Sequence, residues 1–83
     1  MQEMSLEDQV YEVIADEVET REEVEYDTLL KRDLGYNIFR IHNLVLRLEE
    51  CFDIAISEVE HESWAVAKDV FLCVEGKMST GKR

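Results

Sequence analysis

Residues 33–56 read DLGYNIFRIHNLVLRLEECFDIAI, and this stretch decides the fold. Its apolar residues recur at steps of three or four, which is the spacing of a helix that buries one face. They are Ile38, Ile41, Val45, Leu48 and Phe52, with Leu44 beside them. Asn37 can cap such a helix, because its side chain accepts a backbone N–H of the first turn. We therefore predict a central helix from Ile38 to Cys51 or Phe52.

Serines mark the starts of three further helices. Ser5 precedes an apolar series of helical spacing, which predicts a first helix that ends near Glu19. Ser57, followed three residues later by Glu60, has the pattern of a capping box for a short third helix. Ser63 would cap a last helix. Gly76 would end that helix, because glycine is common just past a helix C-terminus.

A long connection joins the first two helices. Residues 20–36 begin with a charged segment and then carry large apolar side chains at irregular spacing, namely Val24, Tyr26, Leu29, Leu30 and Leu34. Flexible linkers lack such side chains. We expect a loop that packs against the domain through its own apolar residues, with Gly35 free to adopt a positive φ.

The chain is short enough for a single domain. It has 83 residues, no proline and 3 glycines, which disfavours an all-β fold because such folds need many turn residues. We predict an all-α four-helix bundle with a long loop between helices one and two. The domain would cover residues 1–76, and residues 77–83 would form a basic, disordered tail.

The charge is acidic overall but unevenly distributed. The formal net charge is -11, and residues 1–27 hold eleven acids against one base. Residues 28–48 are net positive, with Lys31, Arg32, Arg40 and Arg47 against Asp33 alone. Binding to nucleic acid requires a basic face, so this function is disfavoured.

Other classes of site find little support in the sequence. The N-terminus does not read as a signal peptide, and no apolar run approaches the ~20 residues of a membrane span. Cys51 and Cys73 do not make a disulfide framework, and His42 and His61 lack the spacing of metal ligands. We expect a cytoplasmic, monomeric protein that is not an enzyme and binds no metal.

The order of these elements and several motifs resemble the acyl carrier protein family. Residues 33–39 are similar to the D-L-G-x-D-S-L motif of that family. Residues 48–52 are similar to its L-E-E-x-F, and residues 53–56 to its D-x-x-I. The resemblance covers about residues 5 to 75, and it implies a four-helix bundle with a carrier role.

The residue at the attachment position differs from the family pattern. The resemblance implies that a serine of D-S-L carries 4′-phosphopantetheine through a phosphodiester bond. Here the three residues are Asn37, Ile38 and Phe39. Isoleucine has no oxygen, so Ile38 cannot form this bond, and we expect no cofactor at the usual position.

The resemblance also implies a partner surface on the central helix, where the family presents acids to basic patches on enzymes. In this chain Arg40 and Asn43 stand at positions where the family has acids, and Arg47 adds a positive charge. The arginines are either part of a changed docking surface or ordinary solvated charges. The residues expected to contact a partner are Tyr36, Asn37, Ile38, Phe39, Arg40, Asn43 and Arg47.

Three functional hypotheses follow. The first is a carrier-fold protein without phosphopantetheine, with a protein-interaction or regulatory role linked to fatty-acid or polyketide synthesis. The second is a working carrier that is loaded in an atypical way, for example at Ser57 or Ser63. The third is an acidic decoy that binds a basic protein surface through residues 1–27.

Overall fold

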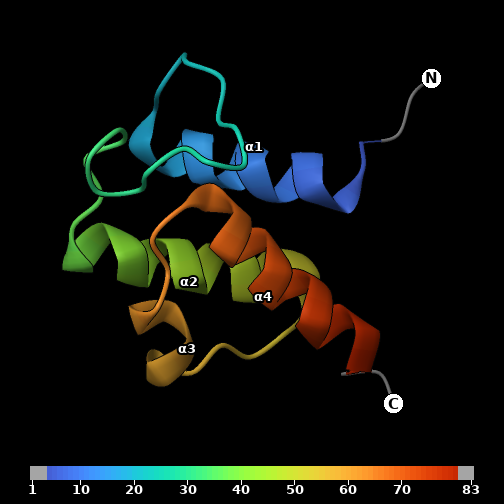
Figure 1. Cartoon of the computed structure of the whole chain (residues 1–83). Coiled ribbons are helices and arrows are strands. Elements are labelled where there is room, and N and C mark those ends of the chain that lie inside the picture. The colour runs from blue at the N-terminus through green and yellow to red at the C-terminus, as the bar shows by residue number, and fades with distance from the viewer. Residues whose placement is uncertain (1–3, 81–83) are drawn as a thin grey trace.

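The computed structural model describes residues 4–80, which fold into four helices (Figure 1). They are α1 (Leu6–Val18), α2 (Ile38–Phe52), α3 (Glu58–Glu62) and α4 (Ala67–Thr80). Within residues 4–80 extended pairing is limited to an isolated bridge between Leu29 and Val66. The prediction of an all-α bundle with a long loop between the first two helices is confirmed.

The predicted caps at the starts of α1, α2 and α3 are present. The Ser5 hydroxyl accepts the N–H of Asp8, and the side-chain oxygen of Asn37 accepts the N–H of Arg40 at 2.9 Å. Ser57 and Glu60 form both hydrogen bonds of a capping box. Each of these bonds satisfies a backbone donor that the helix itself leaves unpaired.

The start of α4 differs from the prediction. Ser63 is not its cap, since it ends α3 and its hydroxyl donates to the carbonyl oxygen of Glu60. α4 begins at Ala67. The carboxylate of Asp69 accepts the N–H groups of Ala65 at 2.8 Å and Val66 at 3.1 Å, so an acid inside the first turn takes the capping role.

The end of α4 also differs. The helix does not stop at Gly76 but continues to Thr80. Glycine costs only about 1 kcal/mol in a helix, and contacts on both sides of it favour continuation. Val74 is fully buried, and the ammonium of Lys77 lies 2.7 Å from a carboxylate oxygen of Glu60 on α3. The division into a domain and a tail stays a prediction, and its last part, residues 81–83, lies outside the described residues.

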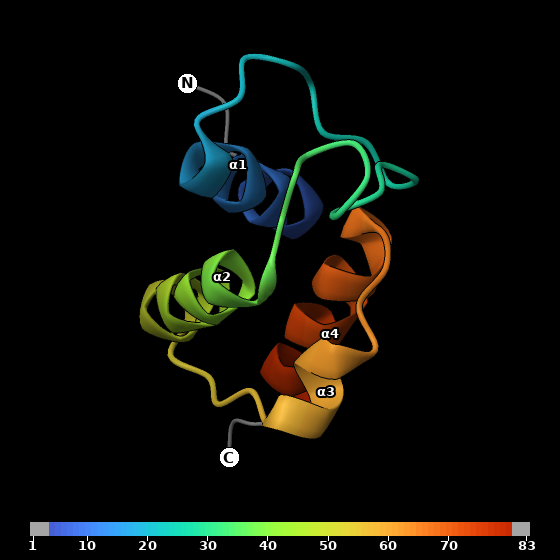
Figure 2. The same cartoon turned by 90° about the vertical axis from the view of Figure 1, so that its left-hand side faces the viewer.

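The core lies between α1, α2 and α4 (Figure 2). Its fully buried large side chains come from all three helices and from the loop: Val10, Ile14, Leu30, Leu44, Leu48, Val70 and Val74. Each such side chain stabilises the fold by about 1.5–3 kcal/mol relative to an exposed position. The apolar periodicity of α2 therefore predicted its buried face.

The loop between α1 and α2 is held to the rest of the bundle by backbone hydrogen bonds. The N–H of Leu30 donates to the carbonyl oxygen of Ala65, and Thr28 and Tyr26 accept from Ala67 and Lys68 at the start of α4. Figure 2 shows the loop passing from α1 to the top of α4 and then down to α2. The loop thus fixes where α2 begins.

Candidate functional site

The first turn of α2 presents two large apolar side chains to solvent. Ile38 is 63% exposed and Phe39 is 75% exposed. Ile38 was predicted to belong to the buried series, but the helix begins there and its side chain is mostly exposed. The backbone at this point is fixed, because Asn37 caps the helix and Gly35 takes a φ of 75° in the turn before it.

The same side of α2 carries a further exposed apolar residue. Leu46 is 62% exposed, although α2 buries Ile41, Leu44, Val45 and Leu48 on its opposite side. Residues seven or eight positions apart are two turns apart on the same side of a helix. Leu46 follows Phe39 by seven positions and Ile38 by eight, so it lies in line with both. We define the outer face of α2 as the exposed residues Ile38, Phe39, His42, Asn43 and Leu46.

The sequence carries a signal for Leu46 that the apolar periodicity of the buried face does not include. Leu46 lies outside the apolar series of the buried face, yet it is a leucine. An apolar residue on the expected polar side of an amphipathic helix indicates a contact surface or an ordinary exposed leucine. Its alignment with Ile38 and Phe39 places three exposed apolar side chains on one side of the helix.

Arg40 and Arg47 are engaged within the molecule. A guanidinium nitrogen of Arg40 donates to the carbonyl oxygen of Glu17 at 2.6 Å. Arg47 forms ion pairs with Asp16 at 2.7 Å and with Glu17 at 3.2 Å. The hydrogen bond that Arg47 donates to the carboxylate of Asp16 raises the pKa of Arg47. Both arginines therefore join α2 to the C-terminal end of α1, where unpaired carbonyl groups favour positive charge.

Tyr36 does not belong to the exposed surface. Its side chain is 3% exposed, and its hydroxyl donates to the carbonyl oxygen of Ile14 at 2.9 Å. Burial raises the pKa of this hydroxyl above its ordinary value. The prediction that Tyr36 offers an apolar group to a partner is wrong. The tyrosine packs into the core and positions the segment before α2.

α3 extends the exposed surface beside the N-terminal half of α2. His42 on α2 and His61 on α3 meet edge to face, with ring centroids 5.3 Å apart, and His61 also packs against Trp64. Val59 on α3 is 78% exposed. Figure 1 shows α3 below the first half of α2. The sequence alone did not indicate this proximity.

The C-terminal half of α2 borders a shallow, acidic depression. Its lining residues are Glu17, Asn43, Leu46, Arg47, Glu49, Glu50 and Asp53. Glu49 also accepts the N–H of Ile56 at 2.8 Å, which holds the chain after α2. The outer face of α2 therefore starts with apolar residues, and acids lie beside its last residue, Leu46.

Other reactive groups do not gather into a site. Among residues 4–80, no group of three or more histidine, cysteine, aspartate or glutamate side chains is arranged to hold a metal ion. Cys51 is exposed and Cys73 is half-buried, and burial raises the pKa of the Cys73 thiol. No helix of the described part has the length and apolar character needed to cross a membrane.

Comparison with known proteins identifies the family. No family model matches the chain. An acyl carrier protein of Sulfurovum sp. (strain NBC37-1) is 34% identical over 73 residues, which cover 87% of this chain and 97% of that protein. This chain belongs to the acyl carrier protein family. A solved structure of a Mycobacterium tuberculosis protein assigned as an acyl carrier protein matches the fold with a TM-score of 0.83. It is 26% identical and covers 87% of this chain and 97% of that one.

Membership of the acyl carrier protein family settles the general class of the molecule. Acyl carrier proteins are carriers without enzymatic activity of their own, and they act through protein partners. The chain is thus an acyl-carrier-protein-like module and not an enzyme.

Proposed function

We propose that this chain is a member of the acyl carrier protein family that does not carry 4′-phosphopantetheine at the usual position. The observation that supports the proposal is Ile38, the first residue of α2, whose side chain is exposed and has no oxygen. An isoleucine here leaves the position accessible but removes the nucleophile that a phosphodiester bond requires.

The serine hydroxyls near α3 offer a poor replacement. Ser57 caps α3, and its hydroxyl accepts the N–H of Glu60. The hydroxyl of Ser63 is engaged with the carbonyl oxygen of Glu60. Both serines come after the end of α2 in the chain, so neither occupies the start of the central helix. Loading at these positions is the alternative that the experiment below also tests.

The proposed role is docking of a protein partner on the outer face of α2 and on the exposed residues of the preceding loop. The exposed apolar groups of Ile38, Phe39 and Leu46 supply the contact. Asn37 and Arg40 position this surface, since the first caps α2 and the second ties it to α1. We place the module in a fatty-acid or polyketide type of carrier system, with an interaction or regulatory role.

The test is a loading assay. The purified protein is incubated with coenzyme A and a phosphopantetheinyl transferase of broad specificity, and its intact mass is measured. We expect no mass gain for the natural chain and a gain of one phosphopantetheine for Ile38→Ser. A second variant, Ile38→Ser with Arg40→Asp, supplies an acid next to the new serine in case the transferase needs one.

The outcomes separate the hypotheses. A mass gain on the natural chain would overturn the proposal, and peptide mapping would then identify the modified residue, with Ser57 and Ser63 as candidates. Failure of both serine variants to load would show that the start of α2 is not an attachment position in this chain. That result would contradict the interpretation that Ile38 replaces the serine to which phosphopantetheine is attached.

A further inference from the structure

Two histidines meet where α2 and α3 come together. The imidazole ring of His42 lies edge to face with that of His61, with ring centroids 5.3 Å apart and an angle of 83° between the ring planes. Trp64 packs against His61, with ring centroids 6.2 Å apart. In the described part of the chain, no hydrogen bond or ion pair connects α2 to α3. The two imidazoles are therefore the polar groups that α2 and α3 bring into contact.

The nitrogens of both rings are available to a ligand. Among residues 4–80, neither imidazole makes a hydrogen bond or an ion pair. His42 is exposed, whereas His61 is only 9% exposed. Within the same residues, no fully buried side-chain nitrogen lacks a partner, so the nitrogens of His61 reach the surface. Imidazole nitrogens are ligands that borderline transition metals prefer.

The distance between the two rings matches shared coordination of one metal ion. Zn²⁺ binds histidine nitrogen at about 2.0–2.1 Å, so the centroid of each bound ring lies about 3.2 Å from the ion. At the tetrahedral angle of about 109°, two such centroids are about 5.2 Å apart. The observed centroid distance of 5.3 Å agrees with this value. Rotation about the Cβ–Cγ bond turns a histidine ring with little movement of its centroid, and this torsion is soft, so exposed His42 can direct a nitrogen toward the ion.

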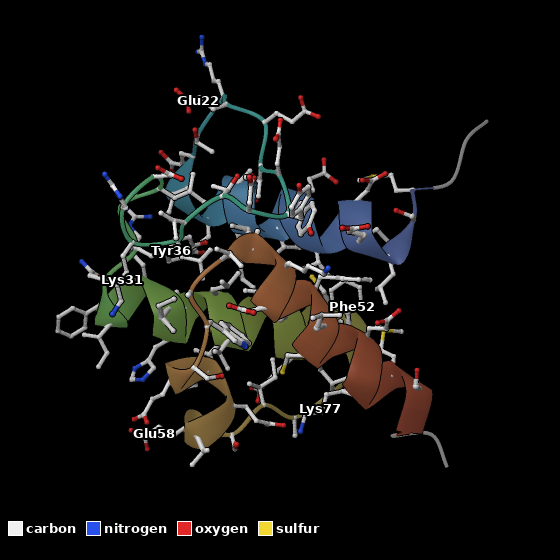
Figure 3. All side chains as sticks on the ribbon, in the orientation of Figure 1. Glu22, Lys31, Tyr36, Phe52, Glu58 and Lys77 are labelled. Carbon is white, nitrogen blue, oxygen red and sulfur yellow. The ribbon has the colours of Figure 1, made fainter. Side chains whose placement is uncertain are left out.

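The charge beside the histidine pair favours a cation. Glu58 precedes His61 by three positions, so the two residues are neighbours on one side of α3. The carboxylate of Glu58 is exposed and makes no hydrogen bond or ion pair with the described residues. Figure 3 shows Glu58 at the edge of the molecule, below the first half of α2. Its negative charge raises the local concentration of cations near the two rings.

We propose that His42 and His61 bind one borderline transition-metal ion of the Zn²⁺ class between α2 and α3. The ion takes one nitrogen from each ring. Among residues 4–80, no group of three or more histidine, cysteine, aspartate or glutamate side chains is arranged for a metal, so water fills the other coordination positions. With two protein ligands, the site binds its ion more weakly and more reversibly than a structural zinc site with four.

The bound ion joins α3 to the first half of the central helix. His42 follows Phe39 by three positions and Ile38 by four, so the ion lies beside the exposed apolar residues of the outer face of α2. Its binding also stabilises the folded chain by mass action. The proposal departs from the expectation of no metal, which rested on spacing along the sequence, because the two histidines meet only in the folded chain. It does not depend on the absence of phosphopantetheine.

The test is isothermal titration calorimetry of the full chain, without a histidine tag, against Zn²⁺. A pH of about 7.5 keeps free histidine mostly neutral and able to bind metal. Excess Mg²⁺ occupies the carboxylates, because hard cations prefer oxygen ligands. We expect one Zn²⁺ per chain. His42→Ala should weaken its binding by about tenfold or more, which is about 1.4 kcal/mol.

Two control variants exclude other ligands. Asn43→Ala is the matched control, since Asn43 is exposed and adjacent to His42 on the same helix. Cys51→Ser removes an exposed thiol, which is the competing ligand for Zn²⁺ on α2. Both variants should bind Zn²⁺ as the natural chain does.

A fluorescence measurement locates the ion. Trp64 is the only tryptophan of the chain and packs against His61. Ni²⁺ quenches indole fluorescence at short range, so we expect quenching in the natural chain and its loss in His42→Ala. His61→Phe keeps an aromatic ring beside Trp64 but removes the nitrogens, and it should lose the quenching as well. Circular dichroism shows that each variant is folded.

Two results would overturn the proposal. One is a folded natural chain that binds no Zn²⁺ at millimolar concentration, since the two rings would then form an aromatic contact only. The other is Zn²⁺ binding that His42→Ala leaves unchanged or that Cys51→Ser abolishes, because the ion would then lie on the acids or on the thiol. Neither result bears on the loading assay, which reads covalent mass.

Discussion

The guanidinium of Arg40 donates a 2.6 Å hydrogen bond to the carbonyl oxygen of Glu17. This bond connects the first turn of α2 to the last turn of α1 across a gap of 23 residues in sequence. Helix C-termini leave carbonyl oxygens without partners, and a cation there is favourable. Arg40 thus both satisfies α1 and fixes the start of the outer face.

Replacement of Arg40 should lower stability. We expect Arg40→Ala to reduce the free energy of unfolding by about 1 kcal/mol, because an exposed charge-assisted hydrogen bond is lost. Urea denaturation followed by circular dichroism measures this change. Arg32→Ala is the control, since Arg32 is exposed and its side chain makes no hydrogen bond or ion pair among residues 4–80. Equal stability of the two variants would contradict the role given to Arg40.

Tyr36 should contribute through its hydroxyl. Tyr36→Phe keeps the buried ring but removes the hydrogen bond to the carbonyl oxygen of Ile14, so we expect a loss of about 1 kcal/mol in the free energy of unfolding. Tyr26→Phe is the matched control, because Tyr26 is exposed and its hydroxyl has no partner in the described part. A loss that is as large in the control would show that the bond to Ile14 is not responsible.

The same tyrosine predicts a pH dependence in alkaline solution. Burial raises the pKa of Tyr36 in the folded chain above its ordinary value of 10.0. The unfolded chain therefore releases this proton first, and the stabilisation is complete below pH 10.0 and falls as the pH rises above it. Melting temperatures measured across this range should fall less steeply for Tyr36→Phe. Parallel curves for the variant and the natural chain would exclude Tyr36 as the source.

Glu60 predicts a pH dependence in acid. Hydrogen bonds from Lys77 and then from the backbone of Ser57 lower its pKa from 4.5 to about 2. The folded chain thus favours the carboxylate, and this stabilisation is present above pH 4.5 and is lost as the pH falls toward 2. Glu60→Gln should flatten the change of melting temperature in this window. Glu62→Gln is the control, and an equal effect there would argue against the contact with Lys77.

Asp69 should control the start of α4. Asp69→Ala leaves the N–H groups of Ala65 and Val66 without their acceptor, and we expect a loss of about 1 kcal/mol in the free energy of unfolding. Asp69→Asn should recover part of the loss, because an amide oxygen can also accept. Asp27→Ala is the control on an exposed acid of the loop. Chemical denaturation compares the four proteins, and a neutral Asp69→Ala would show that the cap is dispensable.

Local patterns predicted much of the secondary structure. The limits of α1 and α2 and the caps at Ser5, Asn37 and Ser57 depend on neighbouring residues, so the sequence carried them. Ser63 and Gly76 have the right chemistry for a cap and a stop, but Asp69 and the contact between Lys77 and Glu60 prevailed. Those competing contacts come from packing that a local pattern does not contain.

The amino-acid sequence by itself determined the helical class, the buried face of α2, the resemblance to acyl carrier proteins and the isoleucine at position 38. These features depend on residue type and on spacing along the chain. The tertiary structure decided that Tyr36 is buried, that Arg40 and Arg47 are held by α1, and that Leu46 continues the exposed surface of Ile38 and Phe39. The physical reason is that burial and pairing depend on which elements meet across the bundle, and distant residues set these contacts.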